Sequence, residues 1–151
     1  MGVARDQGMA RGGERVERSS GAAPPPQSGG SGQATALRVH IEDSAEGPAV
    51  VSFSGELDLS GVARMEGALL EQIRQRPAVL VDLSALDFID SSGIGALIQA
   101  RRAANGTPVS FLVGAGSQVE RVFGIAGVGE ALPLFSDRQA AMAAMAASRS
   151  G

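Results

Sequence analysis

The chain has 151 residues, which is enough for one domain of ordinary size plus a tail. It contains no cysteine and no lysine, which excludes disulfides, thiolate chemistry, Schiff bases and the lysine of a phosphate loop. The net charge of −3 argues against a general nucleic-acid-binding protein, which would carry a basic surface. No apolar stretch is long enough to span a bilayer, and none follows the first arginines as a signal peptide would require. We therefore expect a cytoplasmic protein that makes no direct contact with nucleic acid.

The first 35 residues differ in composition from the rest of the chain. They are rich in Gly, Ser, Pro and Arg, with a triple proline at 24–26 and a Gly/Ser run at 28–32. Such a segment cannot bury enough apolar surface to offset the entropy lost on ordering. We predict a disordered tail over residues 1–35 and a single folded domain over residues 36–148.

The domain opens with two segments of strand character. Residues 36–42 alternate apolar and polar side chains, as a half-buried strand does, and residues 49–54 form a second apolar run. The short connection between them predicts an antiparallel hairpin. An apolar stripe at helical spacing follows over residues 62–73, and we expect this helix to begin at an N-cap Ser60 and to stop at Pro77.

The remaining chain alternates short apolar runs with segments of helical spacing. Because parallel strands need crossover connections, this order predicts an α/β fold with a mixed sheet of about five strands and about four helices. A proline at position 133 predicts that the last strand lies at an edge of the sheet. The expected elements are a strand at 78–83, a helix from Ser91 to about Asn105, a strand at 109–113, a helix at 118–125, a strand at 131–135, and a helix from Ser136 or Asp137 to about Ala147.

The sharpest change of pattern is the sequence Asp90-Ser91-Ser92-Gly93. An apolar run ends just before it, and apolar residues restart after it at helical spacing with Ile94, Leu97 and Ile98. Asp and Ser are the residue types that cap helix N-termini. The sequence therefore places two hydroxyls and a carboxylate where a strand turns into a helix.

A hydrolase nucleophile at this corner is disfavoured. The nucleophile elbow requires glycine two residues before and two residues after the serine, and neither Ser91 nor Ser92 has both. The chain has one histidine, His40, which precedes the serines, whereas the triad histidine of that family follows its serine. We therefore expect a protein that is not an enzyme.

Cofactor and metal sites are also disfavoured. Gly114-Ala115-Gly116 follows a predicted strand, but Val119 stands where a dinucleotide fingerprint has its third glycine. We interpret Asp82 and Asp87 as solvated residues at the end of a strand. No calcium-loop spacing fits the four aspartates of this region, which are Asp58, Asp82, Asp87 and Asp90. We expect no bound cofactor and no metal.

The remaining hypothesis is that a serine at this corner is exposed so that it can be modified. A phosphoryl group adds a charge of about −1.5 to −2, and a helix N-terminus tolerates it because the N–H groups and the dipole favour anions. Next to Asp90, that charge would change the surface that a partner contacts. From the residues alone, an ordinary capping role for Ser91 and Ser92 is the simpler interpretation.

The sequence Phe88-Ile89-Asp90-Ser91-Ser92-Gly93-Ile94-Gly95, preceded by Gly55-Glu56-Leu57-Asp58, resembles the STAS-domain anti-sigma factor antagonists of bacterial partner-switching systems. The resemblance covers roughly residues 36 to 147. It implies a STAS-like fold that opens with a hairpin and carries its helices mainly on one side of the sheet.

The resemblance also implies a function. Unphosphorylated members bind an anti-sigma factor that is also a serine kinase, and thereby release a sigma factor. The kinase ends the binding by phosphorylating the first serine, and a serine phosphatase restores it. Carried over, Ser91 is the acceptor, Asp90 orients the site and Asp58 helps the kinase bind. The residues implied to contact the partner or the kinase are Asp58, Asp90, Ser92, Gly93 and Ile94.

The alternative function, from a different class of protein, is that of a non-catalytic STAS accessory subunit of a membrane transport complex. The intact acceptor sequence around Ser91 favours the phosphorylated class.

Overall fold

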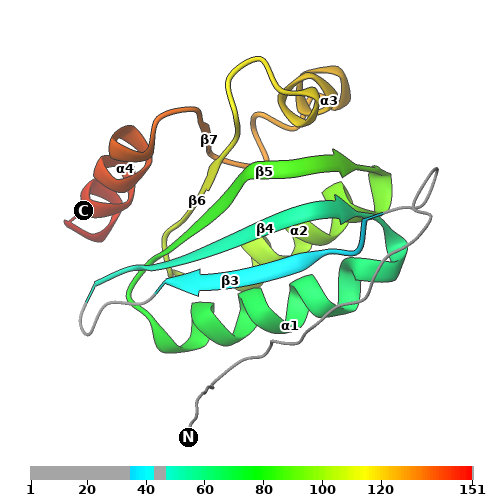
Figure 1. Ribbon diagram of the computed structural model, residues 1–151. Helices are drawn as coiled ribbons and strands as arrows, with labels where there is room; N and C mark the ends of the chain where they lie inside the picture. The colour runs from blue at the N-terminus through cyan, green and yellow to red at the C-terminus, as the bar shows by residue number, and fades with distance from the viewer. Residues whose placement is uncertain (1–34, 43–46, 151) are drawn as a thin grey trace, which may run out of the picture. The chain divides into compact units, whose positions relative to one another are not determined.

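The computed structural model describes residues 35–42 and 47–150 (Figure 1). Apart from Thr35, the tail predicted over residues 1–35 lies outside the described residues. The elements are β3 (Arg38–Glu42), β4 (Ala49–Leu57), α1 (Leu59–Gln75), β5 (Val79–Ile89), α2 (Ser91–Ala103), β6 (Val109–Leu112), α3 (Gln118–Ala126), β7 (Leu134–Phe135) and α4 (Arg138–Ser150).

The five strands form one sheet in the order β3-β4-β5-β6-β7. β3 is antiparallel to β4, and every other neighbouring pair is parallel. The predicted hairpin, the mixed sheet and the edge position of the last strand are therefore confirmed. Within the described residues, none of the helices combines the length and the apolar content that a membrane crossing requires.

Helices pack against both faces of the sheet. Neighbouring residues of a strand point to opposite faces, so Val79 and Val81 of β5 belong to one core and Leu80 to another. α1 and α2 lie side by side over the larger core (Figure 1). The largest buried side chains of this core include Phe53, Met65, Leu69, Leu97 and Phe111. α4 covers the smaller core, which contains Val50, Leu80, Leu112, Ala141 and Met145.

β5 is longer than predicted, because it runs to Ile89 and not to Leu83. Its register against β4 shifts twice, between Ser52 and Ser54 and again between Gly55 and Glu56. Each shift places an extra residue in β5, so the alternation of buried and exposed residues is lost after Leu83. The interpretation of Asp82 and Asp87 as strand-end residues is therefore wrong, since both lie within β5.

β7 is shorter than the strand predicted at 131–135. The N–H groups of Ala131 and Leu132 both donate to the carbonyl oxygen of Val128, so they belong to a turn that follows α3. The ladder with β6 begins where the N–H of Phe111 donates to Pro133, at 2.9 Å. Only Leu134 and Phe135 pair with β6 in register.

Candidate functional site

Two neighbouring parallel strands end at the same edge of the sheet. Leu57, the last residue of β4, pairs in register with Ile89, the last residue of β5. The next residue in each case is an aspartate that caps a helix, Asp58 for α1 and Asp90 for α2. The sheet therefore sets two carboxylates at the starts of two adjacent helices.

Asp58, and not Ser60, is the N-cap of α1, so this detail of the sequence prediction is wrong. The backbone of Asp58 is extended, and its Oδ1 accepts from the N–H of Ser60 at 3.0 Å and from the Ser60 hydroxyl at 2.6 Å. Asp and Ser are comparable as caps, so the residue types alone did not decide between them. β4 ends at Leu57 and α1 starts at Leu59, so Asp58 is the residue that stands at the N-cap position.

Asp90 caps α2 in the same way. Its Oδ1 accepts from the hydroxyl of Ser92 at 2.6 Å and from the N–H of Gly93 at 3.1 Å. The hydrogen bond from Ser92 is the main reason why the pKa of Asp90 lies below its ordinary value, and the Gly93 N–H acts in the same direction, while partial burial opposes both. The carboxylate is therefore ionised at neutral pH, and the Ser92 hydroxyl is bound to it.

Ser91 differs from Ser92 in both exposure and bonding. It is the first residue of α2 and is exposed, whereas Ser92 is half-buried. Its hydroxyl makes no hydrogen bond with any described residue. Of the two serines, Ser91 is therefore the one whose oxygen is available to another molecule.

Gly93 and Ile94 lie beneath this surface. Gly93 is buried, and a Cβ added to it would lie 2.8 Å from Cγ of Leu57 and 2.9 Å from the Leu57 carbonyl oxygen. The side chain of Ile94 is only 8% exposed and belongs to the larger core. The structure thus brings Asp58, Asp90 and the two serines to one edge and places Ile94 in the core below them.

Two exposed apolar side chains near the ends of β4 and β5 had no predicted role. Leu59, the first residue of α1, is 75% exposed, and Phe88 of β5 is 37% exposed and pairs in register with Glu56. The sequence did not mark Leu59 as exposed, because the residue types did not decide between Asp58 and Ser60 as the N-cap. It did not mark Phe88 either, because the register shifts in β5 decide which way its side chain faces.

The aspartates do not form a metal site. Within residues 35–42 and 47–150, no group of three or more His, Cys, Asp or Glu side chains could hold a metal ion. Asp82 accepts instead from the N–H and the hydroxyl of Ser84, at 2.9 and 2.6 Å.

Known proteins that resemble this chain in sequence or in fold belong to the family that the geometry of the site indicates. The model of the STAS domain family matches residues 39–141. The anti-sigma-F factor antagonist RsfB of Mycobacterium tuberculosis is 36% identical over 92 residues, which are 60% of this chain and 75% of the relative. The crystal structure of an anti-sigma factor antagonist from Mycobacterium paratuberculosis aligns with a TM-score of 0.65 at 26% identity, over 74% of this chain and 95% of that one.

The anti-sigma factor antagonist SpoIIAA in its unphosphorylated form shares the fold, with a TM-score of 0.54 at 23% identity over 68% of this chain and 92% of that one. A second SpoIIAA structure, described as a Bacillus cell fate determinant in its phosphorylated form, aligns with a TM-score of 0.50 at 24% identity, over 68% of this chain and 96% of that one. The match of the family model, the identity to RsfB and the Asp-Ser-Ser-Gly corner at the edge of the sheet lead to one conclusion: the chain belongs to the STAS-domain family of the anti-sigma factor antagonists.

Proposed function

We propose that this protein is an anti-sigma factor antagonist switched by phosphorylation of Ser91. In its unphosphorylated form it binds an anti-sigma factor that is also a serine kinase, and a sigma factor is released. The kinase then phosphorylates Ser91 and ends the binding, and a serine phosphatase restores it. The proposal places this cycle in the cytoplasm and assigns it to the STAS domain over residues 36–148.

The observation that carries the proposal is the difference between the two serines. The hydroxyl of Ser92 donates to Asp90 at 2.6 Å, while Ser91 is exposed and its hydroxyl has no hydrogen-bond partner among the described residues. A kinase must place the acceptor oxygen against a phosphoryl donor, so a free and exposed hydroxyl suits that role.

The position of Ser91 suits a reversible charge switch. A phosphoryl group there would stand at the N-terminus of α2, where N–H groups and the helix dipole stabilise anions. The domain would therefore keep its fold. The same group would add about two negative charges beside the ionised Asp90, and a partner that fits the unmodified surface would meet repulsion and a desolvation cost.

The surroundings of Ser91 suit a protein partner. Leu59 and Phe88 offer apolar area, and Asp58 and Asp90 offer charge at the same edge of the sheet. Interfaces commonly combine a few apolar anchors with a polar rim. The relatives RsfB and SpoIIAA are anti-sigma factor antagonists, which supports an anti-sigma factor as the partner.

The first experiment identifies the partner and the modification together. The protein is captured from its native cells in growth and under stress, its partners are identified, and its phosphosites are mapped by peptide mass spectrometry. A histidine-kinase-like ATPase among the partners and phosphate on Ser91 that falls under stress are expected. A membrane transporter as the partner, with Ser91 unmodified in every condition, would instead favour an accessory subunit of a transport complex.

The second experiment tests the switch with the purified partner. In calorimetry, Ser91→Ala should bind like the parent but accept no phosphate, while Ser91→Asp should fold normally and bind weakly. Ser136→Asp is the matched control, because Ser136 is an exposed serine just before α4. Equal binding by Ser91→Asp and the parent would sink the proposed mechanism.

A further inference from the structure

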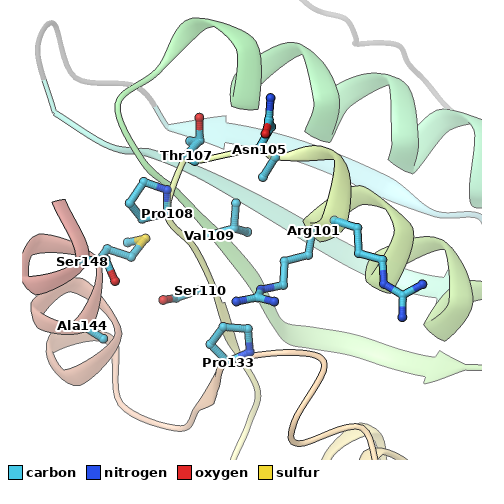
Figure 2. A pocket seen from close by; sticks show the side chains of 13 residues that line it. Arg101, Asn105, Thr107, Pro108, Val109, Ser110, Pro133, Ala144 and Ser148 are labelled. Carbon is cyan, nitrogen blue, oxygen red and sulfur yellow. The ribbon is translucent and has the colours of Figure 1, made fainter. Parts of the chain in front are cut away.

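A pocket of about 430 Å³ lies between the end of α2, the start of β6 and the side of α4 (Figure 2). This volume is in the range of sites for small molecules. α2 begins at Ser91 and reaches the pocket at its other end, so the pocket is separate from the site proposed for the partner. A ligand could therefore bind here whether or not a partner covers Ser91.

All the charged side chains that line the pocket are positively charged. Arg101 and Arg102, in the last turn of α2, are both exposed and both line it. No aspartate or glutamate is among the lining residues, and neither arginine forms an ion pair with another described residue. Two unpaired guanidinium groups at a pocket favour an anionic ligand, because they can bind phosphate or carboxylate in bidentate fashion.

A serine of β6 lines the pocket and offers it a hydroxyl group. Ser110 of β6 is only 3% exposed, and its hydroxyl has no hydrogen-bond partner among the described residues. It pairs in register with Leu80, on the face of the sheet that α4 covers, and Figure 2 shows its oxygen turned away from β6 toward α4. The Ser110 oxygen is not one of the buried side-chain atoms that lack a hydrogen-bond partner, so it is open to the pocket and can hydrogen-bond to a molecule bound there.

The shortness of β7 creates the space. In register, β7 pairs only with Phe111 and Leu112, so Val109 and Ser110 have no strand beside them at that edge. The pocket fills this gap, and Pro108, Pro133 and Met145 give it apolar walls. A ligand bound here would contact both apolar surface and cationic groups.

We propose that this pocket binds a small molecule that carries an oxyanion, phosphate or carboxylate, on an apolar body. The oxyanion binds an arginine guanidinium group at the end of α2, where Figure 2 shows one of the two arginine side chains turned toward Ser110 and the other turned away. The apolar body packs against Pro133 and Met145, and a polar atom of the ligand pairs with the hydroxyl of Ser110. The inference does not depend on the proposed function, because no residue of the partner site takes part in it.

The test is a titration of the full chain followed by amide NMR, with phenyl phosphate as the probe. Saturable shifts are expected at Val109, Ser110 and the end of α2. Benzyl alcohol, which has the ring without the phosphate, and inorganic phosphate, which has no apolar body, should each bind about tenfold more weakly. Benzoate replaces phenyl phosphate in a parallel titration, so that the tighter of the two identifies the oxyanion.

Variants assign the binding to the named groups. The double variant Arg101→Gln, Arg102→Gln should weaken phenyl phosphate binding about tenfold or more, and Ser110→Ala roughly threefold. Arg64→Gln and Arg121→Gln are the matched controls, because both remove an exposed arginine that does not line the pocket. Ser91→Asp should bind the probe like the parent, so the outcome is independent of the phosphorylation switch.

Three results would overturn the inference. They are the absence of saturable shifts at the pocket, equal affinity of the double arginine variant and the parent, and binding of inorganic phosphate as tight as that of phenyl phosphate. Each variant is first compared with the parent by its amide spectrum. Arg101 and Arg102 are exposed, so their replacement should leave the fold intact and keep the test decisive.

Discussion

The N–H of Asp90 donates a hydrogen bond of 3.2 Å to the carbonyl oxygen of Leu57. This bond joins Leu57, the last residue of β4, to the residue that follows β5. Leu57 directly precedes Asp58, and Asp90 directly precedes Ser91. Gly93 packs on the same Leu57 from the first turn of α2. The position of the Ser91 hydroxyl therefore depends on a close approach between the start of α2 and the end of β4.

Replacing Gly93 by alanine should disturb this approach. The new Cβ would lie 2.8 Å from Cγ of Leu57 and 2.9 Å from Cγ1 of Ile89, distances that require the helix start to move. We expect a loss of about 1–3 kcal/mol in the free energy of unfolding, measured by urea denaturation, as for overpacked cores.

Gly95→Ala is the matched control for that substitution. Gly95 lies in the same helix, is exposed and has no atom within 4 Å of an added Cβ. Because alanine favours helices, this variant should gain about 0.5–1 kcal/mol. Similar stability changes in the two variants would show that the contact with Leu57 is not tight.

Removing the hydroxyl of Ser92 should raise the pKa of Asp90. The hydrogen bond from Ser92 is the largest cause of the lowered pKa of this carboxyl group, and Ser92→Ala deletes it while leaving the Gly93 N–H in place. The measurement is a carboxyl NMR titration of parent and variant. Ser60→Ala, which deletes the corresponding hydroxyl at Asp58, should leave the Asp90 titration unchanged. An unchanged pKa in Ser92→Ala would contradict the assigned cause.

The stability of the domain should depend on the charge of Asp90. Its folded pKa lies below the ordinary value of 3.8, so the unfolded chain binds the proton more readily. The contribution of Asp90 is therefore complete above pH 3.8 and is lost as the pH falls through the lower, folded pKa. Asp90→Asn should be less stable than the parent at neutral pH. The difference between their free energies of unfolding, measured by urea denaturation, should become smaller in acid. A difference that stays constant down to acid pH would show that ionisation of Asp90 does not stabilise the fold.

Much of the fold could be predicted because apolar spacing reports burial directly. The alternation of Leu37 and Val39 predicted the first strand, and the glycine after Asn105 marked the end of α2, where Asn105 and Gly106 have positive φ angles of 50° and 102°. The second half of β5 could not be predicted, because two register shifts replace alternation there with buried residues three apart, at Leu86 and Ile89.

The site was predictable in its residue types but not in its bonding. Asp90 and the two serines could be placed at a strand-to-helix corner by their capping chemistry alone. Which serine binds Asp90 depends on the first turn of α2, where the Ser92 hydroxyl reaches Oδ1 at 2.6 Å. The pocket at Ser110 was missed for a related reason, since it exists because β7 stops after two residues.

The exposed apolar side chains near the ends of β4 and β5 should act as anchors for the anti-sigma partner. Leu59 directly follows Asp58, Phe88 lies two residues before Asp90, and both are exposed, so Leu59→Ser and Phe88→Ser should keep the fold and weaken binding by more than about 1 kcal/mol each, as anchor residues do. Calorimetry with the purified partner measures the loss, and thermal unfolding checks the fold.

Ile41→Ser is the matched control for these two variants. Ile41 is 39% exposed, close to the 37% of Phe88, but it pairs with Val51, toward the start of β4 and away from the edge that carries Ser91. It should bind the partner like the parent. If Ile41→Ser lost as much affinity as Phe88→Ser, the partner would have to contact β3, and the edge formed by the ends of β4 and β5 would not be the principal binding surface.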